Sequence, residues 1–315
     1  MNKVCFGCGV KLQCDDINKE GYIPKEKIDN SIYCQRCYRI MHYGVNKVEN
    51  TPKSVDNIIN NINKNRKYGL FITDLININK ELIKIYHRIK GPKLLIINKS
   101  DLIDQSIRFD KIISNLKDIY NIKEDIMIIS SNSGYGIKNL INYLLDNKIK
   151  EVYLLGETNA GKSSLINKMI DVLNSNINKI TTSNFSNTTL DFLRIKLSDE
   201  LVVIDSPGFF IEEKETSNKL INPKIYQMKE NEIIKIDNYY IEFNNNTPIV
   251  IYLNKEVKIN KYFKDIDLNN KIPLDYDSDL IIKGLGFIHI KNKGEIKINT
   301  LDKIEVRKSV LKDYE

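Results

Sequence analysis

"LLGETNAGKSSLIN", Leu154–Asn167, places a glycine-bearing turn between a short apolar run and the start of a helical pattern. The stretch from Gly156 to Ser163 fits the spacing G-x-x-x-x-G-K-[ST] of a phosphate-binding loop. In such a loop, backbone N–H groups and the helix N-terminus hold the phosphates of a nucleotide. We therefore expect Lys162 to contact the β- and γ-phosphates and Ser163 to ligate magnesium, the alternative being a structural glycine turn. The residues expected around the phosphates are Gly156, Asn159, Ala160, Gly161, Lys162, Ser163 and Ser164.

A second motif of a phosphate site, "IDSPG", follows another apolar run near residue 203. It places Asp205 at the end of an expected strand, where the carboxylate can hold the magnesium shell through water. The N–H of Gly208 can then approach a γ-phosphate. An Asp-x-x-Gly alone is a common strand-to-turn ending, so the motif gains its meaning from the phosphate loop.

A third motif, Asn98-Lys99-Ser100-Asp101, directly follows the apolar run "KLLII" and predicts selectivity for guanine. A carboxylate can accept both the N1–H and the exocyclic amine of guanine, so Asp101 is the expected reader of the base. We expect Asn98 to hydrogen-bond the base and the stem of Lys99 to lie along it. A polar turn with Asp101 near a helix start is the alternative. The next apolar run ends in Ser130, Ser131 and Asn132, which we expect to contact the base through their backbone.

The order of these motifs differs from that of an ordinary small GTPase. There the phosphate loop comes first, whereas here the Asn-Lys-x-Asp and serine motifs precede it and Asp-x-x-Gly follows it. A circular permutation, in which the original ends are joined and the chain is opened elsewhere, gives this order. A parallel sheet tolerates this change because domain termini commonly lie near each other. The switch segments, Thr188/Thr189 and Asp205–Gly208, then run directly into the C-terminal part of the chain, so that a γ-phosphate could reorient it.

Apolar periodicity divides the 315 residues into three regions. Residues 1–46 have little sustained apolar pattern, so something other than an apolar core must stabilise their fold. In residues 52–212, Ile/Leu/Val-rich runs alternate with helical stretches, which is typical of an α/β fold with a largely parallel sheet. In residues 213–315, runs such as "YYIEF", "PIVIYLN" and "DLIIKGLGFIHI" predict the antiparallel strands of a small, mostly β domain.

The composition, 42% hydrophobic and 28% charged, is ordinary for a soluble globular protein. The excess of 48 Lys+Arg over 41 Asp+Glu, a formal charge of +7, favours an anionic partner such as RNA. A bias toward Asn, Ile and Lys across the whole chain explains the same excess. No apolar run reaches the ~18 residues of a membrane span, and the N-terminus lacks a targeting pattern, so we expect a cytoplasmic protein with no membrane association.

Two CxxC pairs contain four of the five cysteines, namely Cys5, Cys8, Cys34 and Cys37. Paired thiols in a reducing compartment usually hold metal, and this spacing suits one tetrahedral zinc with four thiolate ligands. The metal would supply folding free energy to a region with little core. A redox-active dithiol is the alternative. Cys14 is expected to be packed or free, and His42 to be a structural or RNA-facing residue. No chemistry is assigned to His87 and His289.

The permuted motif order, together with "CFGCGVKLQCDDINKEGYIP", "CQRCYRIMHYG" and "DLIIKGLGFIHI", closely resembles the YqeH-like family of circularly permuted ribosome-assembly GTPases. The resemblance runs nearly end to end. It implies a treble-clef-like zinc module at residues 1–46, a permuted P-loop GTPase domain at 52–212 and a C-terminal domain at 213–315. It also implies that this last domain contacts RNA or protein during assembly of the small ribosomal subunit.

The resemblance adds a switch threonine to the site. Thr189 matches the threonine that ligates magnesium in this family, beside Ser163 and Asp205, and Thr188 is its neighbour. The family usually has Pro-Gly before the two threonines, whereas this chain has Ser186-Asn187. That departure changes the expected conformation of the loop and keeps both hydroxyls.

The resemblance also implies slow hydrolysis. Phe209 and Phe210 follow Gly208, where other GTPases place a glutamine that positions water. Stimulation by potassium or by a ribosomal partner is therefore expected. Asn159 matches the asparagine with which similar enzymes bind potassium, a turn asparagine being the alternative.

The predicted function is a slow GTPase switch in assembly of the small ribosomal subunit, with GTP/GDP, magnesium and zinc as ligands. Its catalytic group is Lys162, Ser163, Thr189 and Asp205, with no general base among them. An RNA- or ribosome-binding assembly module that senses GTP and GDP with negligible hydrolysis is the alternative from another class. A P-loop kinase is a third interpretation, but it gives no account of Asn98–Asp101. The sequence leaves the assembly step, the RNA site and the oligomeric state open.

Overall fold

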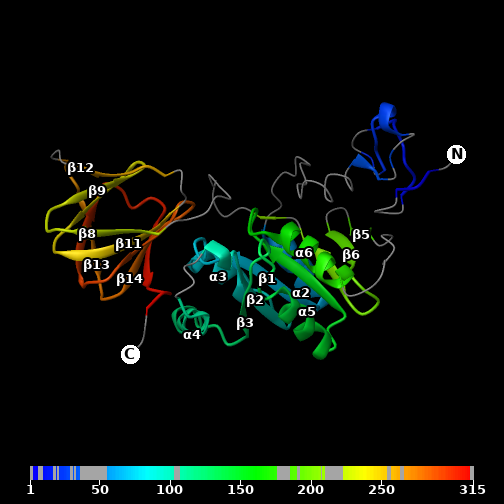
Figure 1. The fold of residues 1–315 in the computed structure, drawn as a ribbon, viewed down its shortest axis with the longest axis horizontal. Coiled ribbons are helices and arrows are strands. Elements are labelled where there is room, and N and C mark those ends of the chain that lie inside the picture. Colours follow the sequence, from blue (N-terminus) through cyan, green and yellow to red (C-terminus); the bar gives the residue numbers. More distant parts are fainter. Residues whose placement is uncertain are drawn as a thin grey trace. The chain divides into compact units, whose positions relative to one another are not determined.

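The computed structural model in Figure 1 describes residues 3–5, 10–16, 19, 21–28, 31, 33–35, 55–102, 107–175, 185–189, 192–206, 208–209, 223–253, 257–262 and 266–312. The chain packs into two compact units. The first unit contains Met1–Thr73, Ile85–Lys99 and Ile126–Phe210, and the second contains Asp74–Lys84, Ser100–Asp125 and Ile211–Glu315. The division at residues 46, 52 and 212 stays a prediction.

A seven-stranded sheet with the order β3-β2-β1-β4-β7-β6-β5 forms the first unit. Its strands are β1 (Tyr68–Asp74), β2 (Lys93–Asn98), β3 (Ile126–Ile128), β4 (Glu151–Gly156), β5 (Phe185–Thr189), β6 (Phe192–Lys196) and β7 (Val202–Asp205). Strands β1, β4 and β7 pair in parallel, as do β2 and β3, whereas β5, β6 and β7 pair antiparallel. The strand that precedes the phosphate loop thus lies between an earlier and a later strand, as the permuted motif order predicts.

Continuous apolar runs build the middle of this sheet. All six residues of β2 are buried, which is typical of a strand covered on both faces. The helices are α2 (Val55–Asn65), α3 (Lys80–His87), α4 (Phe109–Tyr120), α5 (Ile137–Asp146) and α6 (Lys162–Ser175). Residues of α5 and α6, among them Leu140 and Leu165, join Leu70, Ile96 and Leu154 of the strands in one apolar core. No helix in the described part of the chain is both long and apolar enough to span a membrane.

A second apolar layer surrounds Phe71 of β1. Its ring lies 5.6 Å from the ring of Tyr86 and 6.2 Å from that of Phe209. Buried Lys93 donates its Nζ to the carbonyl oxygens of Tyr86 at 3.1 Å and Ile89 at 2.9 Å. These carbonyls lie at and just beyond the end of α3, where a basic side chain commonly hydrogen-bonds the last carbonyl groups of a helix.

Two five-stranded antiparallel sheets form a sandwich in the second unit, with the orders β12-β9-β10-β16-β13 and β17-β14-β15-β11-β8. The strands are β8 (Lys224–Met228), β9 (Ile233–Ile236), β10 (Tyr239–Phe243), β11 (Thr247–Leu253), β12 (Ile259–Tyr262), β13 (Asn270–Leu274), β14 (Ser278–Ile282), β15 (Gly286–Ile290), β16 (Gly294–Ile298) and β17 (Ile304–Lys308). Alternate residues of β11 are buried, so one face of the strand meets the core between the sheets. The run "DLIIKGLGFIHI" forms the pair β14 and β15, which confirms the predicted antiparallel strands.

The N-terminal residues form a small cluster. Its described residues include a short 3-10 helix, η1 (Lys25–Lys27), and two isolated bridges, Val4 with Lys11 and Gln13 with Tyr22. Among its described residues, Cys5, Leu12, Ile23 and Cys34 are buried in one cluster. The expected need for a stabilising metal stays a prediction.

Candidate nucleotide-binding site

The predicted phosphate loop connects β4 to α6, because β4 ends at Gly156 and α6 begins at Lys162. Gly161 has a φ of +97°, and a Cβ there would lie 2.3 Å from the Nδ2 of Asn98. Only glycine adopts this conformation at low cost and leaves room for the asparagine. The strand, turn and helix therefore occur in the order that phosphate binding requires.

Lys162 is held over the loop. Its side-chain Nζ donates to the carbonyl oxygens of Gly156 at 2.9 Å and Glu157 at 3.2 Å. Burial lowers the pKa of the Lys162 ammonium, and the charges of Asp205 and Glu157 oppose that shift. The carbonyl groups of the loop thus position the lysine at the expected phosphate site.

The Asp-x-x-Gly segment lies against the same loop. Residues Glu157 and Phe209 form an isolated parallel bridge, and the N–H of Thr158 donates to the carbonyl of Phe209 at 3.0 Å. A Cβ on Gly208 would lie 3.2 Å from the Nζ of Lys162. The end of this motif is therefore close enough to the lysine to share a phosphate with it.

The side chain of Phe209 is in the apolar core. It is 1% exposed, and its ring packs against Phe71. Its backbone is fixed on the phosphate loop while its ring turns away from water. No polar side chain at position 209 orients an attacking water, as the sequence predicts; Phe210 lies outside the described residues.

The residues expected to hold magnesium fit that ion chemically. Asp205 is the last residue of β7, and Ser163 is the second residue of α6. Hydroxyl and carboxylate oxygens are the hard ligands that magnesium prefers. When bound, magnesium would neutralise charge on the β- and γ-phosphates. Thr188 and Thr189 lie in β5, whose side chains are outside the described residues.

Asn98 joins three loops. Its Nδ2 donates to the carbonyl of Ala160 in the phosphate loop at 3.0 Å. Its Oδ1 accepts the N–H and the hydroxyl of Ser131, at 2.9 and 3.0 Å. The side chain is 2% exposed, so these hydrogen bonds form away from water. The sequence predicted an Asn98 that contacts the base, and the structure adds that it fixes the loops around the site.

The serine loop folds back on itself. The hydroxyl of Ser130 accepts the N–H of Ser133 at 2.9 Å, and the N–H of Ser130 donates to the carbonyl of Tyr135 at 3.0 Å. Asn132 is exposed at the turn. Asp101, on the neighbouring motif, lies in a 3-10 helix, η2 (Ser100–Leu102), and is half-buried.

Two loop residues have left-handed backbones. Lys99 has a φ of 61° and Asn159 a φ of 65°. Asparagine adopts this region more readily than most residues, so the turn gives Asn159 a structural reason for its position. Its role toward potassium stays a prediction.

Glu157 was not among the predicted site residues. It is 3% exposed, and its charge acts on Lys162. In the sequence, Glu157 could have been noticed as a charged residue inside the phosphate loop, at a position where the motif accepts any residue. Its carboxylate brings a second negative charge, besides Asp205, near the lysine.

The N-terminal cysteines are only partly described. Cys5 and Cys34 are both buried, and the N–H of Cys34 donates to the Sγ of Cys5 at 3.1 Å. Cys8, Cys37 and His42 lie outside the described residues. Within the described residues no three His, Cys, Asp or Glu side chains gather as metal ligands. The structure thus brings one cysteine of each pair together, and the zinc site itself is not shown.

The sheet order and the joined loops define a circularly permuted P-loop GTPase. The RsgA GTPase family matches residues 72–214. The protein named uncharacterized protein YqeH from Bacillus subtilis is 28% identical over 285 residues, 82% of this chain and 77% of its own length. The chain is thus similar to circularly permuted GTPases of the YqeH-like type.

Similarity to other proteins is more partial. Mouse nitric oxide-associated protein 1 is 26% identical over 255 residues, which cover 61% of this chain and 36% of that protein. The crystal structure of YjeQ from Thermotoga maritima aligns with a TM-score of 0.32 at 24% identity, over 47% of this chain and 50% of that one.

Proposed function

We propose that the chain is a GTP-dependent switch that acts in assembly of the small ribosomal subunit. The observation that carries the nucleotide part is Asn98, which ties the guanine motif to both the phosphate loop and the serine loop. The ribosomal part is supported by the near end-to-end resemblance to YqeH-like GTPases. The sandwich and the N-terminal module would then contact ribosomal RNA or protein.

In this proposal each motif keeps its predicted role. Lys162 and the loop amides hold the β- and γ-phosphates, and Ser163, Asp205 and Thr189 hold magnesium. Asp101 accepts hydrogen bonds from guanine. Water attacks the γ-phosphate in line, and positioning with charge stabilisation is all that this step requires.

The test of this function is GTP hydrolysis in potassium and in sodium buffer, with and without small ribosomal subunits. We expect slow turnover in sodium and at least about a tenfold increase with potassium or small subunits. The side chain at position 209 cannot position the attacking water, and an added cation or a partner's polar group can stabilise the transition state in its place. Large ribosomal subunits are the matched control, since they carry similar RNA charge.

Each outcome of this measurement separates the candidates. Equal stimulation by large subunits would contradict specificity for the small subunit. Tight GTP binding without turnover in any condition would favour the alternative, an assembly module that senses GTP and GDP, which the buried ring of Phe209 also supports.

We also propose that Cys5, Cys8, Cys34 and Cys37 bind one structural zinc. The N–H to Sγ hydrogen bond from Cys34 to Cys5 supports it, because such bonds stabilise a thiolate. A Cys34→Ser variant should lose its zinc, about one ion per chain by mass spectrometry, and the N-terminal module should unfold. GDP affinity should stay within about twofold, because the nucleotide motifs all lie in another region of the chain, after residue 52.

Cys14→Ser is the control for this prediction, because Cys14 is outside the two pairs. It should keep the zinc and the fold. A Cys34→Ser variant that retains a full equivalent of zinc and an intact module would rule out the four-thiolate site.

A further inference from the structure

An acidic residue is buried inside the phosphate loop. Glu157 directly follows β4 and is only 3% exposed. Glutamate is rarely buried to this extent in a protein. Glu157 is not among the expected ligands of magnesium, which are Ser163, Asp205 and Thr189. The loop is expected to bind an anion, and a carboxylate does not attract one.

The backbone of Glu157 places this residue at the end of the loop where the γ-phosphate is expected. Its carbonyl accepts the Nζ of Lys162 at 3.2 Å and the N–H of Ala160 at 3.2 Å. Glu157 also forms the parallel bridge with Phe209. Phe209 directly follows Gly208, where a Cβ would lie 3.2 Å from the same Nζ. The glutamate is thus joined both to the phosphate-binding lysine and to the Asp-x-x-Gly segment.

The surroundings of the Glu157 side chain are apolar. Residues paired in a sheet, and alternate residues of a strand, point to the same face, so Glu157 shares its face with Phe209 and Leu155. Leu155 pairs with Phe71, whose ring lies 6.2 Å from that of Phe209. Charges interact more strongly in such a medium than in water. In agreement, burial lowers the pKa of the Lys162 ammonium, and Glu157 is one of the two acids whose charge opposes that shift.

A fixed negative charge at this place acts on the phosphates as well as on the lysine. We propose that Glu157 limits the nucleotide affinity of this GTPase, because its carboxylate repels the phosphates, and the γ-phosphate most of all. The inference rests on the proposed placement of the phosphates beside Lys162. Glu157 would then be a determinant of affinity that the loop motif itself does not contain. The wild-type chain should release GTP faster than a chain with a neutral residue at this position.

The test measures the affinities of the whole chain for GMP, GDP and GTP by competition with a fluorescent GDP analogue in EDTA. Without magnesium, each added phosphate increases the negative charge of the nucleotide. Glu157→Gln removes the charge of the side chain and keeps its size. We expect this variant to bind GMP within about twofold of the wild type, GDP about threefold more tightly and GTP at least about tenfold more tightly. The gain should lie mainly in slower release of the nucleotide.

Three further variants show whether charge is the cause. Glu200→Gln is the matched control, because it makes the same chemical change at an exposed position of the same unit, and its affinities should equal those of the wild type. Glu157→Asp keeps the charge and should keep the wild-type order of affinities. Glu157→Met has a similar length without charge, so it should reproduce the gain, and it carries the test if Glu157→Gln fails to fold. Equal changes for all three nucleotides, no change, or weaker binding of GTP in the uncharged variants would overturn the proposal.

Lys162→Ala separates this inference from the proposed placement of the phosphates. If the phosphates lie beside Lys162, this variant should bind GTP at least about tenfold more weakly, since a hydrogen bond to a charged group is lost. Unchanged affinity for GDP and GTP in Lys162→Ala would refute the placement itself. Weaker binding there, with unchanged affinities in Glu157→Gln, would refute only the role of Glu157.

Discussion

Replacing Lys162 with alanine is expected to reduce GTP hydrolysis by roughly 100- to 1,000-fold, which is the usual effect of removing a positioned group that stabilises transition-state charge. The ammonium lies beside the loop at 2.9 Å from the carbonyl of Gly156 and is 9% exposed. Water cannot readily substitute for it in that position. Phosphate release under saturating GTP is the measurement.

The fold of the Lys162→Ala variant should remain intact. Burying a lysine costs free energy, so its removal should leave thermal stability without nucleotide equal or higher. Lys138→Ala in α5 is the control, because Lys138 is exposed and belongs to the same unit. Its hydrolysis should match the wild type. A Lys162→Ala variant that keeps more than about a tenth of the activity would contradict the assignment of the phosphate loop.

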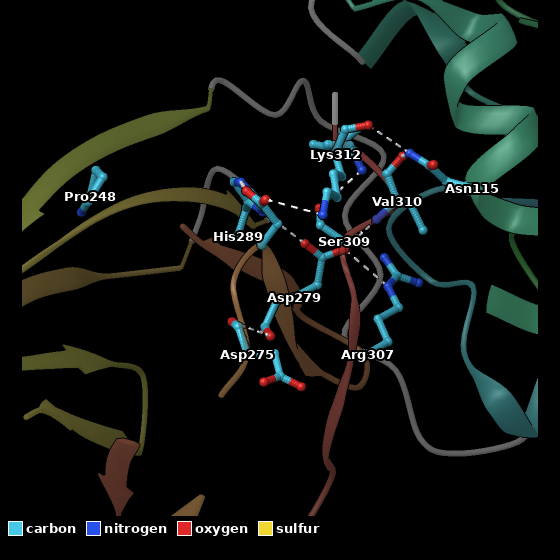
Figure 2. Close-up of polar contacts among 12 residues, drawn as sticks. Asn115, Pro248, Asp275, Asp279, His289, Arg307, Ser309, Val310 and Lys312 are labelled. Atoms are coloured by element: carbon cyan, nitrogen blue, oxygen red, sulfur yellow. Dashed lines mark hydrogen bonds and ion pairs between the residues drawn. The ribbon is translucent and has the colours of Figure 1, made fainter. Parts of the chain in front are cut away.

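Replacing Asp279 with asparagine is expected to lower the free energy of unfolding by about 3–5 kcal/mol, because breaking a buried ion pair leaves an uncompensated charge. Figure 2 shows Asp279 beside Arg307, and both side chains are buried within the second unit. Arg307 would keep its hydrogen bonds to the carbonyl of Ile78 and the hydroxyl of Tyr120 but lose the only charge matched to it at 3.1 Å among the described residues. Urea unfolding followed by circular dichroism measures the effect, since the chain contains no tryptophan.

Asp277→Asn is the matched control for Asp279→Asn. Asp277 also lies near His289, at 3.7 Å, and near Lys312, at 3.8 Å, but its side chain is 23% exposed. Partly exposed ion pairs contribute about 0–1 kcal/mol, so this variant should stay close to the wild type. Equal losses in the two variants would show that burial of the Arg307 pair is not what stabilises the unit.

Several strands were predictable because they are short apolar runs, but their environments were not. "KLLII" in β2 and "PIVIYL" in β11 are both continuous apolar runs, yet all of β2 is buried whereas only alternate residues of β11 are. The phosphate loop was equally clear, since its turn and helix are local in sequence. The role of Asn98 was less so, because its partners lie 33 and 62 residues away.

The cluster around Arg307 could not be predicted from the sequence. In "IEVRK", charged residues alternate with apolar ones, and "DLII" begins with a charged residue; such patterns indicate a strand with one face toward water. That face is instead covered by Ile78 and Tyr120, which come from far earlier in the chain. Burial of this kind depends on tertiary packing, and local periodicity carries no information about it.

The buried hydrogen bonds of Arg307 to Asp279, Ile78 and Tyr120 also limit the order in which the protein can fold as it is synthesised. The arginine and Ile78 are 229 residues apart, so the second unit cannot be completed when its early segments leave the ribosome. Until β17 has been made, Asp279, Tyr120 and the carbonyl of Ile78 all lack their shared partner. Such long-range contacts slow folding. The second unit, begun near the first strand, thus depends on β17 for its completion.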